Sequence, residues 1–407
     1  MSHGKDPGWL QTIEDHARVT FIKIQGIIFV QCAVIALLAA FFLPFRVQAD
    51  GGAPNLAYVA GTGHGVSVID VRGQKVTDTF TITGDPQAIL LSSDGRLLYA
   101  TQPAQGRVSV IAAKTKQAVC SATLPGQPAL LALDPGSNTL YVGGKGANSV
   151  TALDPMTCAV RHIFNLDGEV YGLAVAVVGN TLAGVNGNQL WVASTNALDA
   201  FDTGGRQLAR VPLPAGPRYL CIPPGTTVYA TMRQGTVEAV DLNTRRVLPP
   251  LLMGSTYGPM DYDATTGEVY VPDLQQHRVD VLAPVNAASA TVPHEPRRTF
   301  SFNSEPQSIA ITNDGQLGFV ALVGGDVAML DIPGRQTVTT IHTGGNPHFI
   351  ITGTYPSWIS LTPQQTSLRD IVATYSHYVG AAIVLIAAAI LIYIGKRRQK
   401  QALTPPL

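Results

Sequence analysis

Charged and polar side chains recur in this sequence just before short apolar runs, where a loop would lead into a buried strand. The candidate ligand-binding residues among them are Asp85, Glu169, Tyr171, Arg218, Glu305, His348 and His64. Glu169, Tyr171 and Arg218 could together hold a polar or anionic ligand, because a guanidinium group pairs well with carboxylate or phosphate. Ordinary surface polarity is the simpler interpretation of the same three residues.

The two histidines raise the question of a metal site. His64 and His348 could approach each other, and with Glu305 or Asp85 they could bind a divalent ion. Nothing in the sequence fixes their separation, so solvated loop residues are the simpler interpretation. We therefore predict no catalytic residue, no metal ion and no cofactor.

These residues fall within a repeat that spans residues 50–357. An aromatic residue followed by a small or β-branched one recurs in each unit, at Tyr58, Tyr99, Tyr141, Trp191, Tyr229, Tyr270 and Phe319. Successive members of this series are 38 to 50 residues apart, which is typical of propeller blades. A turn and an alternating segment such as residues 66–70 follow, and alternation with period two predicts a strand with one buried face.

The first unit of the repeat lacks its first strand, and an extra first strand follows the last unit. The first unit begins at its second strand, residues 56–60, and the last unit ends with an extra first strand, residues 348–352. These fragments fit one blade, and radial closure leaves only short, protected sheet edges. The sequence therefore predicts an all-β, seven-bladed β-propeller with four strands in each blade, whereas a linear solenoid would not explain the split unit.

In such a ring, the loops before each first strand share one face with the loops between the second and third strands. Most candidate residues lie in the first set of loops. The second set contains His64, Arg107, Lys145, Asn148, Arg233, Gln276 and His277. Loops held on a rigid scaffold commonly carry function, so we expect a ligand to bind at this upper face or at the mouth of the channel.

Aspartates end five of the alternating strands, at Asp70, Asp154, Asp202, Asp241 and Asp331. They recur in register, and an aspartate caps a turn by accepting hydrogen bonds from backbone amides two residues on. We interpret them as structural rather than catalytic.

The repeat resembles the YVTN-type repeats of surface-layer-like and seven-bladed lactonase-like propellers. The matching residues are Tyr-Val-Ala-Gly at Tyr58, Tyr-Val-Gly-Gly at Tyr141, Tyr-Val-Pro-Asp at Tyr270, the strand at residues 66–70, and Gly-x-Pro at Gly84 and Gly126. No unit carries the Thr-Asn pair of the motif. The resemblance implies the propeller fold, and two activities on similar propellers, lactone hydrolysis and quinone-dependent dehydrogenation, are expectations by fold analogy.

The four cysteines show no CxxC or Cys/His zinc spacing. Cys120 and Cys158 are expected in the outer strands of consecutive blades, where they could form a disulfide outside the cytoplasm. Their offsets from the preceding strand end differ, eight residues against four, which weakens the pairing. Cys221 is expected in an inner strand as a buried free thiol.

Two apolar segments bracket the repeat. Residues 24–43 carry no charge and could cross a bilayer as a helix after a cytoplasmic segment, residues 1–23. Val47-Gln48-Ala49 resembles a signal-peptide cleavage site, so both an uncleaved signal anchor and a cleaved signal are open. Either interpretation places the repeat outside the cytoplasm.

The second segment, residues 377–394, follows a tether at residues 358–376. A basic tail, residues 395–407, comes after it, and basic clusters mark the cytoplasmic side of a span. We therefore predict two transmembrane helices that hold the propeller at the extracytoplasmic face of the cell membrane.

The composition excludes one partner class. Lys and Arg balance Asp and Glu, and only 13% of residues are charged, so a nucleic-acid surface is not expected. We predict a binding or scaffold module for a protein or small-molecule ligand, with a propeller enzyme as the alternative.

Overall fold

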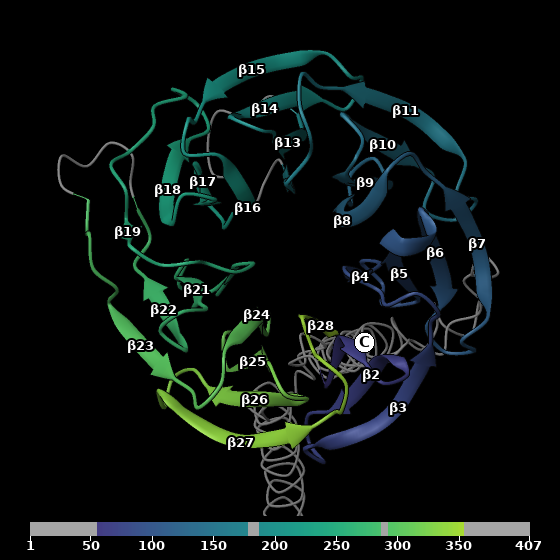
Figure 1. Ribbon diagram of the computed structural model, residues 1–407, viewed down its shortest axis with the longest axis vertical. Helices are drawn as coiled ribbons and strands as arrows, with labels where there is room; N and C mark the ends of the chain where they lie inside the picture. Colours follow the sequence, from purple (N-terminus) through teal and green to yellow (C-terminus); the bar gives the residue numbers. More distant parts are fainter. Residues whose placement is uncertain (1–54, 178–186, 286–291, 354–407) are drawn as a thin grey trace, which may run out of the picture. The chain divides into compact units, whose positions relative to one another are not determined.

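The computed structural model describes residues 55–177, 187–285 and 292–353. These residues form seven four-stranded sheets, which are arranged as blades of a ring in Figure 1. The predicted seven-bladed β-propeller with four-stranded blades is therefore confirmed.

The strands follow one another from the axis of the ring outward in each blade (Figure 1). Blade 1 contains β28 (Phe349–Gly353), β1 (Leu56–Thr62), β2 (Gly65–Asp70) and β3 (Lys75–Thr81). Blade 2 contains β4 (Ile89–Leu91), β5 (Leu97–Gln102), the 3-10 helix η1 (Pro103–Gln105), β6 (Arg107–Ala112) and β7 (Ala118–Thr123). Blade 3 contains β8 (Gln127–Asp134), β9 (Thr139–Lys145), β10 (Ser149–Leu153) and β11 (Val160–Asn165).

The remaining blades repeat this order. Blade 4 contains β12 (Gly172–Ala176), β13 (Gln189–Ala193), β14 (Ala197–Asp202) and β15 (Gln207–Pro212). Blade 5 contains β16 (Pro217–Cys221), β17 (Thr227–Met232), β18 (Thr236–Asp241) and β19 (Leu252–Met253). Blade 6 contains β20 (Asp261–Tyr262), β21 (Val269–Asp273), β22 (Arg278–Leu282) and β23 (Arg298–Ser301). Blade 7 contains β24 (Pro306–Ile311), β25 (Leu317–Leu322), β26 (Asp326–Asp331) and β27 (Gln336–His342).

The ring closes at blade 1, where strands from opposite ends of the repeat pair. The last strand, β28, runs antiparallel to β1, with Tyr58 opposite Ile351 and Ala60 opposite Phe349. Just before β28, the amide of His348 donates a hydrogen bond to the carbonyl of Ala60 at 3.1 Å. This pairing confirms the predicted closure and satisfies a sheet edge that would otherwise be open.

The core lies between blades. The seven repeat aromatics, one in each second strand, are all no more than 2% exposed. The buried apolar residues form seven clusters, each shared by two adjacent blades. The repeating aromatic is therefore a packing residue, and burial of a side chain of that size stabilises each interface between blades.

The strand-ending aspartates cap turns, as the sequence predicts. Asp70 accepts a hydrogen bond from the amide of Arg72 at 3.1 Å, and Asp154 accepts one from Met156 at 2.9 Å. Asp202, Asp241 and Asp331 accept equivalent bonds from backbone amides two or three residues on. Their carboxylates hold local backbone conformation.

Cys120 and Cys158 form a disulfide that joins blades 2 and 3, with their α-carbons 5.8 Å apart. Cys120 lies in β7, but Cys158 lies in the turn before β11 rather than in an outer strand. Its left-handed backbone, with φ of 57°, belongs to the tight turn whose amide bonds to Asp154. Cys221 is a buried free thiol in β16.

The two apolar segments predicted to span a membrane, residues 24–43 and 377–394, lie outside the described residues. Among the residues that are described, no helix has the length and apolar character needed to cross a bilayer.

Candidate functional site

A cavity of about 750 Å³ opens at the upper face of the ring. Loops and inner strands of all seven blades contribute to its wall, from Gln87 in blade 2 round to His348 and Phe349 in blade 1. Ligand sites in proteins commonly have this size and occur where several elements converge. The site therefore depends on the closed ring rather than on any one blade.

The structure brings four of the seven candidate residues to this cavity, and they are Asp85, Tyr171, Arg218 and His348. Glu169, Glu305 and His64 are not part of its wall. Glu305 instead accepts a hydrogen bond from Gln307 at 2.7 Å. His64 is exposed at the tip of the β1–β2 turn.

Tyr171 on the cavity wall contacts Glu169 and an arginine, which both lie outside the wall. The Tyr171 hydroxyl donates to Glu169 Oε2 at 2.8 Å, and the amide of Gly146 donates to Oε1 at 3.2 Å. These bonds, assisted by the charge of Lys145, hold the pKa of Glu169 below its usual value. The Arg233 guanidinium lies 4.4 Å from the centre of the Tyr171 ring. Glu169 is therefore engaged with protein groups and positions the tyrosine.

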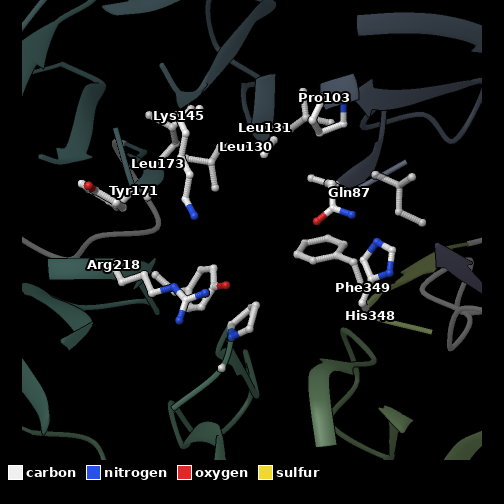
Figure 2. A pocket seen from close by; sticks show the side chains of 18 of the residues that line it. Gln87, Pro103, Leu130, Leu131, Lys145, Tyr171, Leu173, Arg218, His348 and Phe349 are labelled. Atoms are coloured by element: carbon white, nitrogen blue, oxygen red, sulfur yellow. The ribbon is translucent and has the colours of Figure 1, made fainter. Parts of the chain in front are cut away.

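Two cationic side chains reach into the cavity. Lys145 ends β9 in blade 3, and Arg218 follows Pro217 in β16 of blade 5. Figure 2 shows both on the same side as Tyr171, with Gln87, His348 and Phe349 across from them. Among the described residues, neither cation forms an ion pair.

The rest of the wall combines apolar side chains with polar ones such as Gln127 and Gln307. Leu130, Leu173 and Phe349 lie on it, and Asp85 supplies the one carboxylate among its described residues. Asp85 is exposed, has a left-handed backbone with φ of 47°, and lies 3.5 Å from the Gln87 amide nitrogen. The wall as a whole therefore combines apolar surface with an excess of positive charge.

His348 contacts two backbone carbonyls rather than a second histidine. Its Nδ1 lies 3.1 Å from the Asn346 oxygen and its Nε2 lies 2.9 Å from the Pro86 oxygen. The His348 ring packs against the backbone at position 61, where only glycine fits, since a β-carbon there would lie 2.2 Å from Nδ1. The imidazole thus links blade 1 to the loop before blade 2. Within the described part of the chain, no group of three or more His, Cys, Asp or Glu side chains could hold a metal ion.

Lys145 belongs to the upper-face loops in the sequence and is not among the seven ligand-binding candidates. Its position carried a usable signal, because it is the one cation that ends a second strand among the described blades. Phe349 and the leucines were recognisable only as strand residues.

Blade 6 holds a different set of charges, which lie away from the cavity wall. Arg278 Nε lies 2.9 Å from Asp280 and 3.6 Å from Asp273, whose side chains are at most 1% exposed. Burial raises the pKa of Asp280 to about 6, against the opposing charge of Arg278. Arg298 pairs with the buried Glu268 at 2.6 Å.

The sequence matches no family model and no curated protein. Solved structures do resemble it. A dihydro-heme d1 dehydrogenase, NirN, in complex with DHE shares 15% identity at a TM-score of 0.53, over 76% of this chain and 77% of that one. Hydrazine synthase of Kuenenia stuttgartiensis shares 18% identity at a TM-score of 0.52, over 67% and 90% of the two chains.

A third similar structure is the β-propeller domain of Cps50 (Swd1) from Myceliophteria thermophila. It shares 12% identity at a TM-score of 0.55, over 68% of this chain and 91% of that domain. Identities this low show a common fold and nothing finer. The chain is thus similar to propellers with very different names, and the shared property is the β-propeller fold itself.

Proposed function

We propose that this protein is a membrane-anchored, extracytoplasmic propeller that acts as a binding module, with the upper-face cavity as its ligand site. The observation that carries the proposal is the cavity wall, to which all seven blades contribute and in which Lys145 and Arg218 have no ion-pair partner among the described residues. A concave, largely apolar site with a few convergent polar groups is the usual form of a small-molecule site.

The location is part of the proposal. The uncharged segments at residues 24–43 and 377–394, and the basic tail at residues 395–407, support two membrane anchors with the propeller outside the cytoplasm. The disulfide between Cys120 and Cys158 supports the same location, because disulfides persist in oxidising compartments. Membership of the YVTN-repeat propellers is proposed on the motif residues at Tyr58, Tyr141 and Tyr270.

A propeller enzyme is the alternative class, either a lactonase-like hydrolase or a quinone-dependent dehydrogenase. Two of the similar structures carry the names of enzymes, NirN and hydrazine synthase, but one fold hosts many unrelated functions. A scaffold that binds a protein at the same face is a further form of the binding proposal. The cavity favours a small molecule over a flat protein surface.

Native mass spectrometry of the purified full-length chain tests the binding proposal. Gln87 lies exposed on the cavity wall, so Gln87→Trp should fill the mouth without disturbing the core. We expect a small molecule to accompany the unchanged protein and to be absent from Gln87→Trp. The matched control is Gln117→Trp in the exposed turn before β7, which should retain the molecule. Equal occupancy in all three proteins, or none in any, would contradict the proposal.

A further inference from the structure

We infer that the ligand of this cavity is an organic monoanion, with its carboxylate or similar oxyanion held between Lys145 and Arg218 and its apolar body against Leu130, Leu173 and Phe349. The inference rests on the proposed binding function and names its ligand class. It depends on three properties of the wall, namely its charge, the way its cations are held, and its apolar surface.

The charge of the wall favours an anion. Lys145 and Arg218 face the cavity, and Asp85 is the one carboxylate among its described lining residues. Lys145 is exposed and Arg218 is half-buried, so an incoming anion costs little desolvation of protein charge. The cations are therefore available to a ligand, and Asp85 on the same wall disfavours a second negative charge.

The arginine is positioned without being neutralised. The centre of its guanidinium lies 4.5 Å from the Tyr219 ring centre, and a stacked guanidinium keeps N–H groups at its edge free to donate. Its backbone is fixed as well, since a β-carbon at Gly172 would lie 1.8 Å from the Arg218 carbonyl oxygen. Blades 4 and 5 can approach this closely only because glycine occupies that position.

The lysine forms no ion pair with Glu169, the acid whose pKa its charge lowers. Glu169 accepts hydrogen bonds from Tyr171 at 2.8 Å and from the Gly146 amide at 3.2 Å. The charge of Lys145 lowers the pKa of Glu169, but the two groups form no ion pair. A carboxylate that meets an arginine fork and a lysine point charge gains two charge-assisted contacts.

The apolar surface determines that the anion is organic. Leu130, Leu173 and Phe349 border the same space as the cations, as Figure 2 shows. An inorganic anion would leave this surface in contact with water, whereas an apolar body would remove it. A cavity of about 750 Å³ has room for such a molecule.

Isothermal titration calorimetry on the purified full-length chain can test this with probes that share one body and differ in charge. The probes are phenylbutanoate, phenylbutanol and phenylbutylamine, with acetate as an anion that has no apolar body. We expect phenylbutanoate to bind about tenfold more tightly than phenylbutylamine, and acetate to bind more weakly than phenylbutanoate.

The variants locate the effect. Lys145→Gln and Arg218→Gln should each weaken phenylbutanoate binding about tenfold and weaken phenylbutanol binding by a clearly smaller factor. Lys75→Gln and Arg72→Gln, exposed near the outer turn of blade 1, are the matched controls and should bind as the unchanged protein does.

Equal affinity for the acid, the alcohol and the amine would overturn the anion preference while leaving the proposed binding function standing. Unchanged phenylbutanoate affinity in both cavity variants would overturn the placement of the anion. Binding of none of the probes would overturn the ligand class, and native mass spectrometry would then decide separately whether the cavity holds any molecule.

Discussion

Arginines in two regions of the propeller differ in whether they have a buried carboxylate partner. In blade 6, Arg278 and Arg298 lie beside carboxylates of Asp280 and Glu268 that are at most 7% exposed. At the cavity, Arg218 stacks on a tyrosine and has no ion-pair partner among the described residues. A buried carboxylate without a partner is costly, so the blade 6 arginines stabilise the fold. The cavity arginine neutralises no buried carboxylate among the described residues and is available to a ligand.

The difference suggests a way to separate structural from functional charge in this molecule. A charged side chain that neutralises a buried partner should matter for unfolding and little for binding. One that points into a cavity without a partner should show the reverse. Three predictions for charge variants test that contrast, and loss of the disulfide gives an uncharged reference, in order from the largest expected effect on stability to the smallest.

Arg298→Ala should destabilise the protein by about 4 kcal/mol, because it leaves Glu268 buried with a poorer partner. Arg298 is 16% exposed and also donates to the Tyr270 hydroxyl at 2.6 Å. The matched control is Arg297→Ala, since Arg297 contacts the same Glu268 but is 60% exposed. Denaturant unfolding measures both. An equal loss of unfolding free energy in the two variants would show that burial of the arginine does not determine how much its contact with Glu268 stabilises the protein.

Loss of the disulfide should cost about 3 kcal/mol in the double variant Cys120→Ser/Cys158→Ser, since the crosslink restricts the unfolded chain. It joins residues 38 apart in sequence and clamps blade 2 to blade 3. Unfolding with and without a reductant measures the effect. The reductant should lower the stability of the unchanged protein to that of the variant. If it has no effect on the unchanged protein, the bond does not form in solution.

Asp280 should make stability depend on pH. Its pKa in the fold is raised to about 6 by burial, so its contribution is fully present below its ordinary value of 3.8 and is lost as the pH rises through 6. The free energy of unfolding of Asp280→Asn should therefore rise relative to that of the unchanged protein as the pH increases from about 4 to about 6. The expected rise is about 1 kcal/mol, given screening near the partly exposed Arg278.

Unfolding measured across this range tests the Asp280 prediction. Asp261, whose pKa burial also raises to about 6, is present in both proteins and cancels in the difference. A difference between the two proteins that does not change with pH would contradict the assignment.

Lys145→Gln and Arg218→Gln should change the free energy of unfolding by less than about 0.5 kcal/mol each, because neither removes the partner of a buried charge. Denaturant unfolding alongside Arg298→Ala gives the comparison directly. A loss in Arg218→Gln as large as that of Arg298→Ala would remove the distinction between the two regions.

Local pattern in the sequence determined the repeat, the number of blades, the closure through β28 and the capping role of the aspartates. Each of these follows from spacing along the chain, because strands alternate and turns close within a few residues. The disulfide was harder to predict, since unequal offsets argued against it. Cys158 lies in a left-handed turn before the outer strand, and the two α-carbons are 5.8 Å apart.

Which charged residues share a partner was decided only by the tertiary structure. The sequence grouped Glu169, Tyr171 and Arg218 as one ligand site. In the fold, Glu169 accepts a hydrogen bond from Tyr171 and lies outside the cavity wall, whereas Tyr171, Arg218 and Lys145 line it. Side chains on different blades meet according to the twist of each sheet and the packing between sheets. Spacing within one repeat carries no measure of distance across the ring. The sequence therefore predicted the propeller and four residues of the cavity wall, and only the fold decided which side chains on different blades meet.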